Sequence, residues 1–99
     1  MMCAMPAYLI LNSEVTSPER YAEYVKAAGN TVAQYGGRYL VRGGGAERLE
    51  GSVEPKRVVV LAFDSADRAR AWWASPEYAG PKAMRQSAAE TDMILVEGV

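Results

Sequence analysis

The 99-residue sequence contains no histidine and only one cysteine, Cys3. Without histidine, the chain cannot build a Ser-His or Cys-His nucleophile pair, the common zinc sites or a histidine-ligated haem. A single cysteine cannot form an intrachain disulfide or a thiolate metal cluster, and we interpret Cys3 as incidental. Acid–base chemistry must therefore use Asp, Glu, Tyr, Lys or water, and we expect neither a metal nor another cofactor.

The sequence also lacks an excess of charge and a long apolar segment. Its formal net charge is −1, and it has no basic stretch typical of nucleic-acid binding. No apolar run approaches the roughly 18 residues needed to cross a bilayer. The start, Met1 to Pro6, lacks the charged and apolar regions of a signal peptide, and we expect it to fray. These absences predict a soluble, cytoplasmic, single-domain protein over residues 1–99, with neither nucleic-acid nor membrane partners.

The run from Arg57 to Asp64 is the most informative feature that is present. Its interior is continuously apolar, with the sequence Val-Val-Val-Leu-Ala-Phe. A strand with one face in water alternates apolar and polar residues, whereas a continuous apolar run needs cover on both faces. The run therefore predicts a strand whose second face is covered by something other than the chain's own helices.

Periodicity and turn residues predict further helices and strands. Ser17-Pro18 is a strong helix start, and Gly36-Gly37 is a typical helix end. The predicted order is strand 7–15, helix 18–35, strand 38–42, strand 57–64, a helix from about 66, a helical stretch from Pro76 or Pro81 to about 89, and strand 92–96. Gly80-Pro81 is expected to break or kink the last helical stretch. A short edge strand around Arg48 and Leu49 is a further expectation.

This strand–helix–strand–strand–helix–strand order is the split βαβ arrangement of an α+β, ferredoxin-like fold. Right-handed crossovers place the helical regions on one face of a four-stranded antiparallel sheet. The opposite face then carries alternate residues of apolar strands, and apolar surface is costly to leave in water, at about 25 cal/mol per Å². We therefore expect a homodimer that pairs the two open sheet faces.

A set of short segments follows a recognisable order along the chain. The segments are Ala7-Tyr8, Ser17-Pro18-Glu19-Arg20-Tyr21-Ala22-Glu23-Tyr24, the stretch from Tyr35 to Gly44, Ser75-Pro76-Glu77-Tyr78 and Val96-Glu97-Gly98-Val99. Together they cover nearly the whole chain and resemble the uncharacterised family called domain of unknown function 1330. This resemblance implies the dimeric α+β barrel fold, in which two ferredoxin-like subunits pair their sheets. It implies little about function.

The wider superfamily of dimeric α+β barrels is a looser resemblance. It includes cofactor-free monooxygenases, lactone isomerases, polyketide cyclases, haem-dependent dehydratases and proteins without known activity, which place ligands between the sheet and its own helices. Many of the monooxygenases carry a histidine on the helix where this chain has Trp72 and Trp73. The missing histidine argues against both a monooxygenase and a haem enzyme.

Arginine is the characteristic charged residue, with eight copies against three lysines. Its planar guanidinium can hold a carboxylate through two parallel hydrogen bonds. Arg42 ends one strand, Arg57 begins the next and Arg85 lies on the second helical region, so these three are candidates for binding an anionic ligand. The alternative is that they form solvated ion pairs at strand ends, where such pairs contribute little.

Aromatic residues form a second group of candidates. Tyr24 lies on the apolar stripe of the first helix, where it either packs in the core or serves as a weak acid facing a pocket. Tyr39, Trp73 and Tyr78 are candidates for apolar pocket walls with a polar tip. Trp72 and Trp73 are about 100° apart on a helix, so we expect one to pack beneath it and the other to cover a pocket mouth or the dimer seam. The sequence does not indicate which of Trp72 and Trp73 faces the pocket.

Asn12 and Glu14 share one face of the first strand with Tyr8 and Ile10, because side chains in a strand alternate with period two. A polar pair that follows two apolar residues suits the end of a cavity. Asn12 is therefore a candidate for ligand binding, and Glu14 is the candidate general base. The alternative is a solvated strand end.

The sequence thus predicts a homodimer in which each subunit holds a small aromatic or carboxylate-bearing metabolite. Any catalysis would be cofactor-free proton transfer or cyclisation, with Glu14 or Tyr24 as the acid–base group. A non-catalytic binding or structural module is the first alternative. A cofactor-free enzyme resembling the monooxygenases is the second.

Overall fold

The computed structural model describes residues 5–99, so the expectations for Cys3 and the first residues lie outside this range. The elements are β1 (Ala7–Val15), α1 (Pro18–Gln34), β2 (Arg38–Arg42), β3 (Arg57–Phe63), α2 (Ala66–Trp73), α3 (Pro76–Ala88) and β4 (Ala89–Glu97). This is the predicted order, with the second helical region divided into α2 and α3. No helix within the described residues combines the length and apolarity needed to cross a bilayer.

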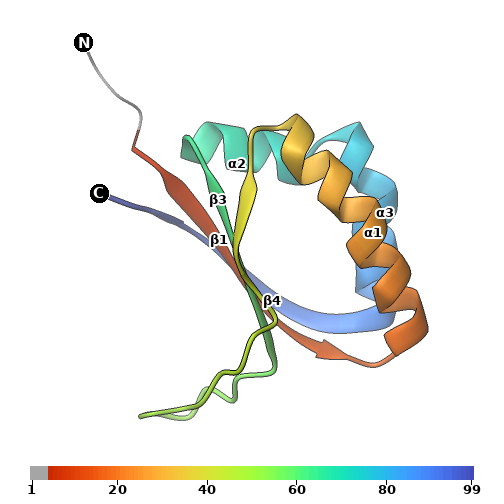
Figure 1. Ribbon diagram of the computed structural model, residues 1–99, viewed down its shortest axis with the longest axis vertical. Helices are drawn as coiled ribbons and strands as arrows, with labels where there is room; N and C mark the ends of the chain where they lie inside the picture. The colour runs from red at the N-terminus through yellow and green to blue at the C-terminus, as the bar shows by residue number, and fades with distance from the viewer. Residues whose placement is uncertain (1–4) are drawn as a thin grey trace.

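The four strands form one antiparallel sheet in the order β2-β3-β1-β4. All three helices lie on the same side of this sheet, and α1 runs beside α3 (Figure 1). β3 lies between β1 and β2, so the connection through α1 crosses over one strand, as in a split βαβ unit. The predicted α+β ferredoxin-like fold is confirmed.

Serine residues precede all three helices. The Ser65 side chain accepts a hydrogen bond from the Arg68 N–H at the start of α2, and the Ser75 side chain accepts one from the Tyr78 N–H at the start of α3. Ser17 occupies the equivalent position before α1, but its side chain makes no capping hydrogen bond. The proline that follows it sets the backbone angle of the first turn instead.

The expected break at Gly80-Pro81 is absent, and α3 continues through this pair without interruption. Proline at position 81 removes the hydrogen bond that would reach the carbonyl of Glu77, four residues earlier. Glu77 lies in the exposed first turn of α3, where water can satisfy that carbonyl. The loss of this hydrogen bond therefore costs little, because the carbonyl that loses its partner is exposed to water.

Two further segments differ from prediction. Residues 43–56, which connect β2 and β3, form an irregular loop, and no strand forms at Arg48 and Leu49. β4 begins at residue 89, three residues before the predicted strand, because its first residues already pair with the end of β1. In Figure 1 the loop extends away from the helices, beyond one end of the sheet.

We call the side of the sheet that the helices cover its inner face. It carries the buried apolar residues of the two central strands, Leu9, Leu11, Val59, Leu61 and Phe63. Above them, the fully buried ring of Trp72 stacks on that of Tyr78 with a centroid separation of 3.9 Å. The Trp72 indole N–H also donates to the Thr31 hydroxyl, 3.0 Å away. These contacts join the sheet, α1, α2 and α3 in one core.

The opposite side, which we call the outer face, is uncovered by any element within residues 5–99 (Figure 1). One apolar row crosses all four strands through residues that pair directly, Val41, Val60, Ile10 and Ile94. Ile94 is 59 % exposed. Towards one end the face becomes polar, with Asn12 opposite Asp92 and Glu14 opposite Glu90. An exposed apolar row with a polar rim is typical of a protein-binding surface.

Candidate functional site

A cleft of about 780 Å³ lies between the inner face at β4 and the helices α2 and α3. Its apolar lining residues are Leu9, Ala69, Trp73, Ala74, Ala89, Met93 and Leu95. Its polar lining residues are Arg70, Arg85, Gln86, Glu90 and Thr91. A volume of several hundred Å³ with a mostly apolar lining suits a small organic molecule.

The two adjacent tryptophans have separate roles at this cleft. Trp72 is in the core, whereas Trp73 lines the cleft and is 43 % exposed. The ammonium of Lys82 lies 3.8 Å from the centroid of the Trp73 ring and donates to the Trp73 carbonyl at 3.1 Å. Lys82 thus holds one face of the indole by a cation–π contact. Of the two neighbours, Trp72 therefore packs beneath the helix and Trp73 lies at the cleft.

Arg85 is a buried cation in the wall of the cleft, with only 5 % of its surface exposed. Its Nε donates a long hydrogen bond of 3.4 Å to the Tyr78 hydroxyl. That hydroxyl is in turn 2.9 Å from the Tyr24 hydroxyl. Within residues 5–99, the ion pairs join Arg48 to Glu54, Lys56 to Glu14 and Arg70 to Asp67, so Arg85 has no carboxylate partner there.

Tyr24 lies behind Arg85, on the core side. Burial, together with the adjacent Tyr78, raises the pKa of Tyr24 far above its usual range. The phenol is therefore neutral at physiological pH and is unsuited to act as a base, although it can donate a hydrogen bond. Its only hydrogen-bond partner within the described residues is Tyr78.

Tyr39, Arg42 and Arg57 occupy a different place, a narrow pocket of about 20 Å³ at the β2–β3 side of the core. This space holds about one water molecule. The Arg42 guanidinium lies 4.3 Å from the centroid of the Tyr39 ring, and that of Arg57 lies 5.3 Å from the centroid of Tyr21. Burial raises the pKa of Tyr39. The aromatic rings and side chains fill this region, so it has no room for a metabolite.

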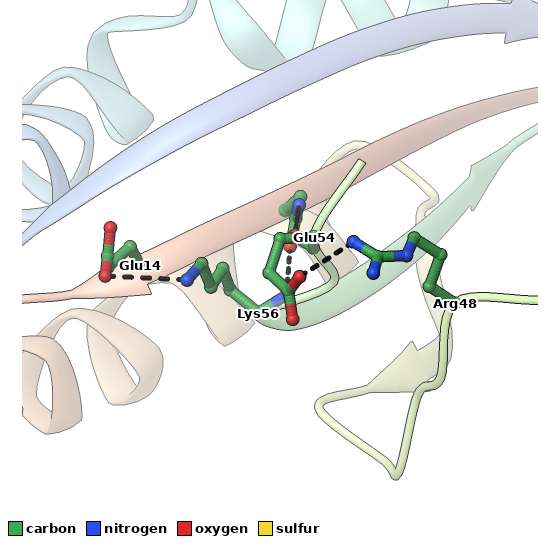
Figure 2. Close-up of polar contacts among 5 residues, drawn as sticks. Glu14, Arg48, Glu54 and Lys56 are labelled. Atoms are coloured by element: carbon green, nitrogen blue, oxygen red, sulfur yellow. Dashed lines mark hydrogen bonds and ion pairs between the residues drawn. The ribbon is translucent and has the colours of Figure 1, made fainter. Parts of the chain in front are cut away.

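Asn12 and Glu14 lie on the outer face. The Asn12 amide donates to the Glu54 carbonyl at 3.0 Å and accepts from the Lys56 N–H at 2.7 Å, so it binds the backbone of the 43–56 loop. Two ion pairs involve the same loop, Glu14 with Lys56 at 3.7 Å and Arg48 with Glu54 at 3.0 Å (Figure 2). These contacts attach the loop to β1 rather than forming part of the cleft.

The sequence candidates are therefore divided among three locations. Arg85 and Trp73 line the cleft, and Tyr78 supports Arg85 from behind. The cleft also contains residues that were not predicted as a site, Arg70, Gln86, Glu90, Thr91, Met93 and Leu95. The alternation of residues 91, 93 and 95 with their neighbours would have placed Thr91, Met93 and Leu95 on one face of the last strand.

Comparison with known proteins identifies the family. The family described as "Domain of unknown function (DUF1330)" matches residues 6–99. The chain belongs to this family. The resemblance drawn from its short segments is thereby confirmed. No curated protein matches the chain.

Solved structures with the same fold share little sequence with this DUF1330 chain. A protein of unknown function from Rhodopseudomonas palustris is 18% identical, with a TM-score of 0.79, over 96% of this chain and 83% of that one. SnoaB, a cofactor-independent oxygenase from Streptomyces nogalater, is 12% identical, with a TM-score of 0.64, over 97% and 95%. A dimeric ferredoxin-like protein of unknown function from Thermobifida fusca is 14% identical, with a TM-score of 0.66, over 96% and 92%. At these identities the similarity establishes the fold alone.

Proposed function

We propose that this DUF1330 protein is a homodimer in which each subunit binds a small aromatic or carboxylate-bearing metabolite in the cleft between α2, α3 and β4. The observation that carries this proposal is the cleft itself, about 780 Å³ in volume, with an apolar floor and one buried cation, Arg85, in its wall. The narrow pocket near Arg57 has room for about one water, and the hollow near Glu14 is polar. The cleft is therefore the best candidate for a ligand with an apolar body.

Dimerisation through the outer face is supported by two observations. The row that includes Val60 and Ile94 is apolar, crosses the sheet and has no cover within residues 5–99. The similar protein from Thermobifida fusca is described as dimeric. In such a dimer the outer faces would meet, and the cleft of each subunit would remain on its own inner face.

Binding without catalysis fits the contents of the cleft better than proton transfer does. Of the two acid–base candidates, Glu14 lies on the outer face and Tyr24 is a buried neutral phenol behind Arg85. Glu90 borders the cleft, but its side chain lies on the outer face opposite Glu14.

Cofactor-free oxygenation is a second candidate, favoured by the similarity to SnoaB. In that case the bound metabolite would be the reductant and molecular oxygen the oxidant. Oxygen uptake with an electron-rich phenol as substrate tests this candidate. Uptake no faster than in the absence of protein would exclude that substrate class.

Native mass spectrometry of the purified protein tests the binding proposal. We expect a retained small molecule in the wild-type protein and its loss in an Ala74→Trp variant, in which the new indole fills the cleft. Ala79→Trp is the matched control, because Ala79 is an exposed residue of α3 outside the cleft lining. A protein that carries no small molecule, and that fails to bind an apolar dye more tightly than the Ala74→Trp variant, would contradict the proposal.

A further inference from the structure

Arg85 is the most buried charged residue in the described part of the chain. It is 5 % exposed, and no carboxylate of residues 5–99 lies within ion-pair distance. A buried charge without a partner is strongly unfavourable, since its hydration is lost without compensation. Arginine cannot lose its proton to relieve this cost. A counter-ion from outside the chain would relieve it.

The hydrogen bonds of Arg85 indicate which of its atoms are available. Nε is used by the Tyr78 hydroxyl, while the two terminal nitrogens make no hydrogen bond within residues 5–99. Arg85 lines the cleft, and Tyr78 is fully buried. The side chain is therefore held from the core side and can present its terminal nitrogens to the cleft. Two terminal nitrogens in one plane match the two oxygens of a carboxylate.

The two phenols behind Arg85 orient it without neutralising it. Tyr78 accepts from Nε, and the Tyr24 hydroxyl lies 2.9 Å from the Tyr78 hydroxyl. Burial raises the pKa of Tyr24, so this group stays protonated and provides no negative charge. The stacking of Tyr78 on Trp72 further fixes the phenol that receives the Nε hydrogen bond. Such buried, hydrogen-bonded support is what pre-organises a binding group.

We propose that the cleft binds an organic monocarboxylate with a flat aromatic or branched apolar body, with its carboxylate on the terminal nitrogens of Arg85 and with Tyr78 and Tyr24 as positioning residues for that guanidinium. This inference rests on the proposed function, and it assigns the anionic group to Arg85 rather than to Arg42 or Arg57. Leu9, Met93 and Leu95 would contact the apolar body.

The charges around the cleft favour a monoanion over a phosphate dianion. The other arginine of the lining, Arg70, already pairs with Asp67 at 3.1 Å. The Glu90 side chain lies on the outer face, opposite Glu14, so it does not neutralise Arg85. One unpaired cation compensates a single negative charge, whereas a second negative charge on the ligand would remain without a partner.

Calorimetric titration with naphthalene-2-carboxylate and its neutral isostere naphthalene-2-carboxamide tests this inference on the full-length protein. We expect the carboxylate to bind at least tenfold more tightly than the carboxamide, and this preference to disappear in Arg85→Met. Arg20→Met, on the exposed side of α1, is the matched control and should keep the preference. Tyr78→Phe, which keeps the ring, should lower carboxylate affinity severalfold and leave carboxamide affinity unchanged, an effect that loss of packing would not produce.

A second measurement covers the case in which Arg85→Met fails to fold. In the wild-type protein, the arginine side-chain N–H signals in ¹⁵N NMR should show one Nε–H resonance shifted by the carboxylate and unmoved by the carboxamide, and this resonance should be missing in Arg85→Lys. Equal binding of both probes, with the arginine signals unmoved, would overturn the Arg85 assignment and leave the binding cleft intact. Failure of both probes and of an apolar dye to bind would instead overturn the proposed function itself.

Discussion

The inner and outer faces of the sheet are both apolar near the middle, but only the inner face is covered by the chain's own helices. On the inner face, Leu9 and Leu61 are buried beneath Trp72 and its neighbours. On the outer face, Ile94 lies at the same level of the sheet with most of its side chain in water. One face thus stabilises the single chain, whereas the other can gain from burial only when a second molecule covers it.

Removing a core ring should have the largest effect on the inner face. Trp72→Ala would remove a fully buried ring, its stacking on Tyr78 and its hydrogen bond to Thr31. We expect the free energy of unfolding to fall by about 3–5 kcal/mol, as for other buried aromatic residues replaced by alanine. Urea unfolding at a fixed protein concentration measures it.

The neighbouring tryptophan is the matched control for that experiment. Trp73→Ala alters the same helix and the same residue type, but the side chain is half-exposed at the cleft. We expect a loss of less than about 1 kcal/mol. Equal losses of unfolding free energy in the two variants would contradict the assignment of Trp72 to the core and of Trp73 to the cleft.

A charge on the outer face should break the proposed dimer and leave the chain folded. Ile94→Lys would place an ammonium at the β4 end of the apolar row that we expect to be buried between subunits. Burying a charge in place of an apolar side chain at an interface costs about 2 kcal/mol or more, which raises the dissociation constant of the proposed dimer about thirtyfold. Analytical ultracentrifugation measures this constant, and circular dichroism checks the fold.

Leu49→Lys is the control for the outer face, because Leu49 is exposed on the 43–56 loop rather than on the sheet. We expect it to leave the dimer unchanged. A wild-type protein that sediments as a monomer at micromolar concentration would contradict dimerisation through this face.

The comparison of the two faces also explains how far the sequence alone could lead. Period-two alternation correctly placed Asn12 and Glu14 on the same face as Tyr8 and Ile10. It did not decide which face this was, because β3 is apolar on both sides and both faces of β1 begin with apolar residues. The pair was therefore expected at a cavity end, whereas it holds the 43–56 loop on the outer face.

The candidate arginines show a second limit of sequence reasoning. Arg42 and Arg57 are close in the chain's hairpin, and Arg85 precedes the last strand. The strand order β2-β3-β1-β4 then separates them, because the hairpin lies on one side of β1 and β4 on the other. Residue type and spacing predicted the chemistry of each group, but only the order of strands in the sheet decides which groups meet.

Raising the pH above 10 should lower the free energy of unfolding through Tyr24, whose phenol is buried in the core. The unfolded state loses this phenolic proton near pH 10, whereas burial raises the pKa in the folded state. Above pH 10 the unfolded chain therefore binds fewer protons, and the free energy of unfolding falls with pH. Below pH 10 this contribution is fully present, so the pH dependence from Tyr24 begins only above that value.

The Tyr24→Phe variant isolates this effect. Each pH unit above 10 should remove up to about 1.4 kcal/mol from the wild-type protein through Tyr24. The Tyr24→Phe variant has no phenol at this position and should not show this loss. The difference in unfolding free energy between the two proteins should therefore become smaller or reverse from pH 10 to pH 11. Urea unfolding at pH 8, 10 and 11 measures it, and a constant difference would contradict the assignment.

The smallest effect is expected from the ion pair on the outer face. Glu14 and Lys56 are 3.7 Å apart, and both side chains are well exposed, so Glu14→Gln should change the unfolding free energy by less than about 0.5 kcal/mol. Asn12→Ala, two residues earlier on the same face, should cost about 1 kcal/mol, because it removes two hydrogen bonds to the loop backbone. Binding of naphthalene-2-carboxylate should be unaffected by Glu14→Gln, since Glu14 does not line the cleft. A loss of binding in this variant would contradict the placement of the ligand in the cleft of a single subunit. It would indicate that Glu14 of one subunit contacts a ligand bound by the other.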